Sequence, residues 1–101
     1  MREYYGKRVK DFFETKGKYF LVKPAIMRAL PKSEKGHRLL DVGCGTGVLY
    51  DAVAKKGFKY YGIDASEEML KRAGLEHPHG GYIVARGDKF AHFLRGSLTL
   101  L

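Results

Sequence analysis

The feature that most constrains this chain is a glycine-rich turn that directly follows a short apolar run. The stretch covers residues 39–47 and reads LLDVGCGTG, with Gly43, Gly45 and Gly47 at alternate positions. A strand that turns sharply into a helix needs positive φ angles, which glycine adopts without a Cβ clash. Glycine also lets a ligand lie almost against the main chain, and a helix N-terminus favours an anionic group. The stretch therefore predicts a nucleotide-type cofactor site at the carboxyl end of a parallel strand.

The spacing of the glycines and two nearby acids narrow the kind of cofactor. A dinucleotide fingerprint reads G-x-G-x-x-G, so the third glycine here comes one residue early, which disfavours an NAD-type enzyme. No Gly-Lys-Ser/Thr sequence follows, so the stretch is not a P-loop. Asp41 precedes the glycines, and Asp64 ends the next apolar run. An acid at the end of the second strand, as Asp64 is here, can accept both ribose hydroxyls of an adenosine.

The chain around this turn alternates between apolar runs and segments with helical periodicity. We expect strands at residues 38–42, 59–63 and 82–85, and helices at residues 47–56 and from Ser66, a predicted N-cap, to Gly74. This β-α-β-α-β series predicts parallel strands joined by right-handed crossovers. The last apolar run, residues 97–101, is expected to form a fourth strand.

The first third of the chain is expected to be helical. Tyr4 and Tyr5 begin one apolar stripe at helical spacing, and Tyr19 begins a second that contains Pro24. We therefore divide the chain into an N-terminal helical segment, residues 1–37, and a partial cofactor-binding domain, residues 38–101.

At these motifs the chain resembles the class I S-adenosylmethionine-dependent methyltransferases, over residues 38–89. The resemblance implies that the glycine loop passes beneath the methionine and ribose of the cofactor. It also implies that Asp64 binds the ribose hydroxyls, that Asp88 meets the adenine amine, and that Asp41 steadies the loop and can approach the methionine amine. The expected cofactor site comprises Asp41, Gly43, Cys44, Gly45, Gly47, Asp64, Ala65, Met69, Gly87 and Asp88.

The resemblance implies an α/β fold with a Rossmann-like parallel sheet, here truncated to about four strands in the order 3-2-1-4. The family's full sheet has seven strands, and its second half supplies most substrate contacts. Its leading helices often cover the cofactor, which implies that Tyr4, Tyr5 and Tyr19 line the entrance to the site; alternatively, they anchor the core with their hydroxyls in water. Strand four would then be a bare apolar edge, which is a template for pairing with another chain. The chain is accordingly interpreted as a truncated product, as half of a split enzyme, or as a homodimer that pairs through this edge.

The expected function is the cofactor-binding portion of an S-adenosylmethionine-dependent methyltransferase, which is an enzyme if a partner chain or dimerisation completes it. The alternative is a non-catalytic S-adenosylmethionine-binding or assembly module that pairs with another chain. Methyl transfer from a sulfonium relies mainly on alignment, so no catalytic residue is assigned and the methyl acceptor is left open. His77 and His79 have no third ligand nearby, so no metal site is expected.

The composition of the chain limits the partners, the location and the cysteine chemistry that can be expected. Residues 1–38 carry 11 Lys or Arg and 4 Asp or Glu, whereas residues 39–101 carry 8 and 7, so the basic N-terminal part permits nucleic acid binding or is a solvated surface. No apolar run is long enough for a membrane span, and a cytoplasmic location is expected. The single cysteine, Cys44, excludes an internal disulfide and is either a reactive thiol or a small loop residue.

Overall fold

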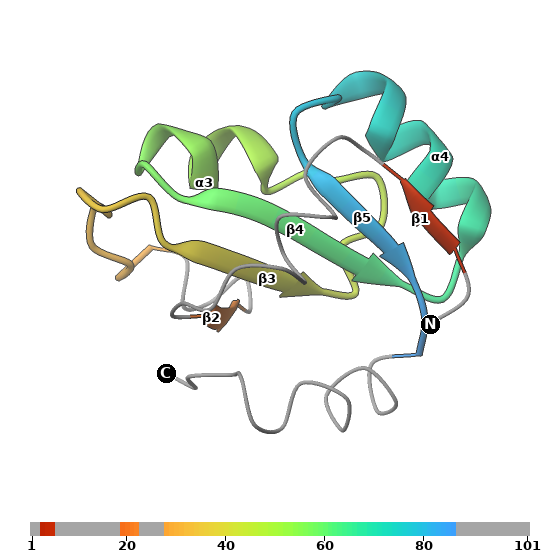
Figure 1. The fold of residues 1–101 in the computed structure, drawn as a ribbon, viewed down its shortest axis with the longest axis horizontal. Helices are drawn as coiled ribbons and strands as arrows, with labels where there is room; N and C mark the ends of the chain where they lie inside the picture. The colour runs from red at the N-terminus through yellow and green to blue at the C-terminus, as the bar shows by residue number, and fades with distance from the viewer. Residues whose placement is uncertain (1–2, 6–18, 23–27, 87–101) are drawn as a thin grey trace.

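The computed structural model describes residues 3–5, 19–22 and 28–86 of the chain. These residues form one five-stranded sheet, with two helices over it (Figure 1). The elements are β1 (Glu3–Tyr5), β2 (Tyr19–Val22), β3 (Arg38–Val42), α3 (Tyr50–Lys55), β4 (Lys59–Asp64), α4 (Glu67–Glu76) and β5 (Gly81–Val84).

The strands lie in the order β1-β5-β4-β3-β2. Strands β2 to β5 run parallel, and β1 pairs antiparallel with β5 at one edge. The three central strands β5, β4 and β3 have the predicted order and direction, and the α/β class with a Rossmann-like parallel sheet is confirmed. Helices α3 and α4 connect β3 with β4 and β4 with β5, and both cover the same face of the sheet (Figure 1).

The place beside β3 is filled by β2 rather than by the strand expected at residues 97–101, so the order 3-2-1-4 is not confirmed. Residues 97–101 lie outside the described residues. The partner that β3 does have, β2, reads YFLV and pairs with it from Tyr19 opposite Arg38 to Val22 opposite Asp41. Its aromatic and β-branched residues suit a strand, and the pairing satisfies the backbone groups on that edge of β3.

The expectation of N-terminal helices is wrong at residues 3–5 and 19–22, which form β1 and β2. Tyr4 and Tyr5 therefore lie in β1, and Tyr19 lies in β2. Short apolar runs fit a strand as well as a helix, and here pairing with β5 and β3 decides between them. The remaining N-terminal expectations fall on residues 6–18 and 23–27, outside the described part, and the boundary between residues 37 and 38 stays a prediction.

Buried apolar side chains lie on both faces of the central strands. On the helical face, Leu39, Tyr60 and Tyr82 pack with side chains from both helices, of which Val53 and Leu70 are fully buried. On the opposite face a second buried set comprises Leu40, Tyr61, Ile63 and Ile83. The central strands therefore read as near-continuous apolar runs.

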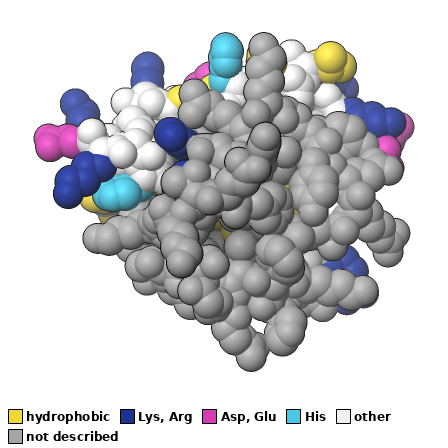
Figure 2. Space-filling model, viewed as in Figure 1, with side chains coloured by type: hydrophobic (Ala, Val, Ile, Leu, Met, Phe, Trp, Pro, Cys, Tyr) yellow, Lys and Arg dark blue, Asp and Glu magenta, His cyan; other side chains and the backbone are white. Residues whose placement is uncertain are grey.

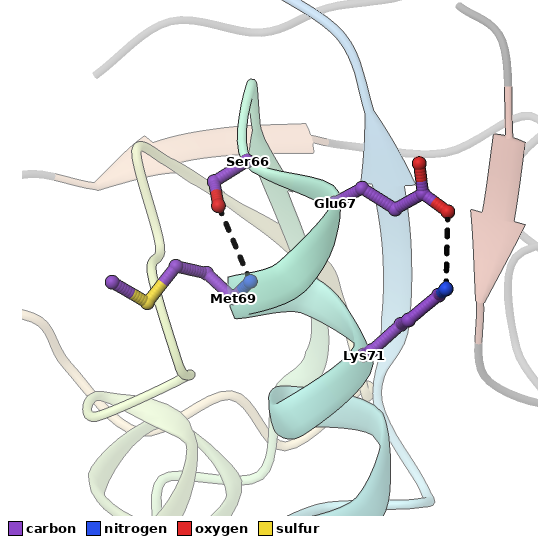
Figure 3. A network of polar contacts seen from close by, with 4 residues as sticks. All are labelled: Ser66, Glu67, Met69 and Lys71. Carbon is purple, nitrogen blue, oxygen red and sulfur yellow. Dashed lines mark hydrogen bonds and ion pairs between the residues drawn. The ribbon is translucent and has the colours of Figure 1, made fainter.

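The helix ends differ from the predicted bounds for local reasons. Helix α4 begins after Ser66, whose Oγ accepts the N–H of Met69 at 3.3 Å, which confirms the predicted N-cap (Figure 3). An ion pair of 3.3 Å between Glu67 and Lys71 spans its first turn (Figure 3). Helix α4 continues through Gly74 to Glu76. Helix α3 begins at Tyr50 rather than at Gly47, because Gly47 has a positive φ that does not fit a helix.

The surface charge of the described part is dispersed. Figure 2 shows Lys and Arg side chains in separate groups on this face, some of them beside Asp or Glu side chains. Two such pairs, Lys71 with Glu67 and Arg72 with Glu76, are exposed ion pairs on α4. Nucleic acid binding by the basic N-terminal part stays a prediction.

The segment that precedes β3 is attached to the end of α3. Lys56 Nζ donates to the carbonyl oxygen of Leu30 at 2.5 Å, and the N–H of Ser33 donates to the carbonyl oxygen of Lys56 at 2.6 Å. Gly57 lies directly under this contact with φ of +90°, and a Cβ there would overlap the carbonyl oxygen of Ser33. Gly57 therefore ends the helix and also permits the close approach.

We expect Gly57→Ala to lower the free energy of unfolding by about 2 kcal/mol more than Gly36→Ala. Gly36 also has a positive φ, +63°, but the nearest atom to a Cβ there is Lys59 Cε at 3.9 Å. Both substitutions carry the cost of a left-handed backbone, and only the first adds a clash with the main chain. Urea denaturation of the two variants measures the difference, and equal losses would contradict the assignment of the clash.

Candidate cofactor site

The glycine loop leaves the carboxyl end of β3 and turns back toward α3 (Figure 1). Gly43, Gly45 and Gly47 have φ angles of +76°, +58° and +80°. Within the described ranges, no residue other than glycine has a positive φ. All three glycines therefore use the conformational freedom for which the sequence predicted them.

The glycines of the loop have different surroundings. Among the described residues, a Cβ at Gly43 or Gly45 would meet no atom within 4 Å, whereas a Cβ at Gly47 would lie 3.3 Å from His77 Cδ2. The first two glycines therefore border open space that can receive a ligand, and the third allows the loop to pack against the end of α4. This open cradle fits a cofactor that lies against the main chain.

The start of the loop is held by the neighbouring strand. The N–H groups of Gly43 and Cys44 both donate to the carbonyl oxygen of Ile63, at 2.8 and 3.1 Å. A third bond, from the N–H of Gly47 to the carbonyl oxygen of Cys44 at 3.0 Å, closes the turn. The loop therefore continues the β3–β4 ladder before it turns away.

The acid that ends β4 contacts the same loop. Asp64 Oδ2 accepts the N–H of Gly45 at 2.8 Å, and Oδ1 accepts the N–H of Ser66 at 2.9 Å. A carboxylate has about four acceptor positions, so further donors can still bind. The structure thus brings together the predicted ribose-binding acid and the predicted glycine loop, which are 19 residues apart in sequence.

Asp41 lies beneath the loop rather than at its surface. Its side chain is 4% exposed, and Oδ2 accepts the hydroxyl of Tyr60 at 2.6 Å. Burial raises the pKa of Asp41, and the hydrogen bond from Tyr60 opposes this shift. The approach of Asp41 to a methionine amine stays a prediction.

Cys44 is a buried thiol. Desolvation, with a smaller effect of the Asp41 charge, raises its pKa to about 12. Its Sγ packs over Gly62, where a Cβ would come within 2.5 Å of it. Of the two interpretations of Cys44, the geometry therefore fits a small loop residue and not a reactive thiol, because the reactive form of a cysteine is an accessible thiolate.

Comparison with known proteins decides the family. Residues 13–96 match the family described as methyltransferase domain. The chain belongs to this methyltransferase-domain family. It is 44% identical over 58 residues to a ubiquinone biosynthesis O-methyltransferase from Bordetella avium, covering 57% of the chain and 24% of that protein. It is 58% identical over 48 residues to the putative methyltransferase YqeM from Bacillus subtilis, covering 48% and 18%.

Among solved structures, an S-adenosylmethionine-dependent methyltransferase from Mesorhizobium loti superposes with a TM-score of 0.49 and 36% identity, covering 64% of the chain and 30% of that structure. The methyltransferase-domain chain spans between 18% and 24% of the length of the first curated relatives that it matches.

The structure describes some of the remaining expected site residues and not others. Ala65 is exposed directly after Asp64, and Met69 is 48% exposed on the first turn of α4 (Figure 3). Gly87 and Asp88 lie outside the described residues. The sequence pattern does not identify Tyr60 or Gly62 as site residues, although both lie in β4, the strand that pairs with β3 before the loop. The feature that could have identified them is a hydroxyl group and a missing side chain within an otherwise apolar run.

Metal-binding groups and membrane-spanning helices are considered for the described part of the chain. Its His, Cys, Asp and Glu side chains do not form a group of three or more that could hold a metal ion. Its helices are too short or too polar to cross a membrane.

We expect Cys44 to react at pH 8 with a disulfide reagent at least about 100-fold more slowly in the folded chain than in urea, because its pKa is about 12. The rate should rise about tenfold per pH unit up to pH 10, since the thiolate fraction grows in that proportion. The release of thionitrobenzoate from the reagent, followed by absorbance, measures both quantities.

The matched control is Ala52→Cys combined with Cys44→Ala, which places the single thiol at an exposed position of α3. This thiol should react at nearly the same rate with and without urea. Equal protection at both positions, or a rate for Cys44 that levels off below pH 9, would contradict the buried neutral thiol.

Proposed function

We propose that the methyltransferase-domain chain binds S-adenosylmethionine at the glycine loop and forms the cofactor-binding portion of a methyltransferase. The observation that carries this proposal is the bond from the Gly45 N–H to the Asp64 carboxylate at 2.8 Å. It joins the loop and the acid into one site beside the open cradle over Gly43 and Gly45. Membership of the methyltransferase-domain family supports the same cofactor.

Each part of the site would hold a different part of the cofactor. The free acceptor positions of Asp64 would take the ribose hydroxyls, and the bare backbone at Gly43 and Gly45 would let the ribose and methionine lie close. Met69 offers a half-exposed, polarizable side chain at the start of α4 that would pack against the adenine. Asp88 is proposed for the adenine amine.

When bound, the cofactor supplies a sulfonium methyl group that a nucleophile can attack. The residues of this chain then bind and orient, since alignment of the acceptor with the methyl carbon lowers the barrier most. Cys44 keeps its proton, because its pKa is about 12, so it does not compete as a nucleophile. The N–H groups of Gly45 and Ser66 hold the Asp64 carboxylate in position beside the loop.

The methyl acceptor would be bound by residues beyond those described. The matched relatives include ubiquinone biosynthesis O-methyltransferases, so hydroxyl acceptors are the class to test first. We propose that a second copy or another polypeptide pairs through the edge predicted at residues 97–101. If the chain binds the cofactor but releases no demethylated product with any acceptor, the non-catalytic binding module is the better description.

We expect the parent chain to bind S-adenosylhomocysteine with micromolar affinity and Gly45→Val to weaken this binding at least about tenfold, because the side chain fills the cradle. Gly36→Val is the matched control. Gly36 and Gly45 have φ angles of +63° and +58°, so the backbone strain is the same, but Gly36 lies before β3 and away from the loop. Calorimetric titration measures the affinities, and circular dichroism checks the fold.

Asp64→Asn should also weaken binding at least about tenfold, because an amide has half the acceptor capacity and no charge. The matched control is Asp51→Asn, whose side chain is 85% exposed on α3 and should leave the affinity unchanged within about twofold. If Gly45→Val and Asp64→Asn bind as tightly as the parent, the proposed site is wrong. If the parent itself does not bind, the proposed function is wrong for this chain.

A further inference from the structure

A single hydroxyl from β4 lies directly beneath the glycine loop. Tyr60 is 2% exposed, and its hydroxyl donates to Asp41 Oδ2 at 2.6 Å. Asp41 is in β3, two residues before Gly43, so a side chain of β4 contacts the end of the strand from which the loop starts.

The position of this hydroxyl is set by packing that does not involve the loop. The Tyr60 ring lies edge-on to Tyr50 with centroids 5.4 Å apart, and it is tilted against Tyr82 at 6.2 Å. Tyr60 also belongs to the central strand of the sheet, opposite Leu39 in β3. Its hydroxyl is thus a fixed point against which the loop can be held.

The loop depends on such a fixed point because glycines lose more conformational entropy than other residues when they are ordered. A ligand that binds only one loop conformation has an apparent affinity reduced by the fraction of chains in that conformation. Without the Tyr60 hydroxyl, the buried Asp41 carboxylate would lose a hydrogen-bond donor in a site that is 4% exposed. The carboxylate would then move toward water and displace the start of the loop with it.

We propose that Tyr60 is a positioning residue of the cofactor site, whose hydroxyl holds the start of the glycine loop through Asp41 in the conformation that receives the cofactor. The part that concerns the cofactor rests on the proposed function. The part that concerns the loop does not, and it can be measured without a ligand.

The test is Tyr60→Phe, with Tyr82→Phe as the matched control. Tyr82 is also fully buried on the helical face, but its hydroxyl donates to the carbonyl oxygen of His77 at 2.8 Å, beyond α4. Each substitution removes one buried hydroxyl and one hydrogen bond, so both should lower stability by a similar amount. Only Tyr60→Phe removes the contact with Asp41 at the start of the loop.

Amide hydrogen exchange provides the first readout. In Tyr60→Phe the amides of Cys44 and Gly45 should exchange at least about tenfold faster than in Tyr82→Phe, relative to the amides of Ile63 and Ile83 in the central strands. A general loss of stability would accelerate the strand amides as well, so this ratio isolates the loop. Equal ratios in the two variants would overturn the proposal.

Affinity for S-adenosylhomocysteine provides the second readout. Tyr60→Phe should bind at least about fivefold more weakly than the parent, and Tyr82→Phe should bind within about twofold of it. If the parent binds and both variants bind equally well, Tyr60 does not position the site. If the parent does not bind, the proposed function fails, and the exchange ratio alone decides whether Tyr60 holds the loop.

Discussion

The parallel pairing of β3 with β4 is the constraint on which the rest of the site depends. It sets Asp41 opposite Gly62 and Val42 opposite Ile63, so the glycine loop begins where β4 still has free acceptors. The carbonyl oxygen of Ile63 takes two N–H groups of the loop, and the Asp64 carboxylate takes a third. A one-residue slip would move Tyr60 and Gly62 to the other face of the sheet and remove the support beneath the loop.

The helical face of the sheet combines bulky tyrosines with positions that have no side chain. Tyr60 and Tyr82 need both space and a hydrogen-bond partner when they are buried. Gly62 makes room for Cys44, and Gly80 makes room for the Tyr82 hydroxyl, which would lie 2.5 Å from a Cβ there. These glycines are needed for packing, whereas Gly43 and Gly45 border open space. The same residue type therefore has two distinct uses within one small core.

Local signals predicted most of the site and the central sheet. The alternate glycines, the acid after the next apolar run and the Ser66 N-cap each depend on a few neighbouring residues, and the structure places the loop and Asp64 together as expected. Residues 3–5 and 19–22 were assigned to helices because their apolar spacing is compatible with both periods. Their pairing with β5 and β3 depends on strands that lie far away in sequence, which periodicity does not reveal.

The sequence by itself determined where the chain must turn, because only glycine accepts the positive φ angles at residues 43, 45 and 47 at low cost. It also indicated where the central strands lie, since each is a short, mainly apolar run. Only the tertiary structure decided what holds the loop. The Tyr60 hydroxyl reaches Asp41 across two paired strands, and the Asp64 carboxylate turns toward Gly45. Such contacts depend on strand register and side-chain direction, which a linear pattern does not contain.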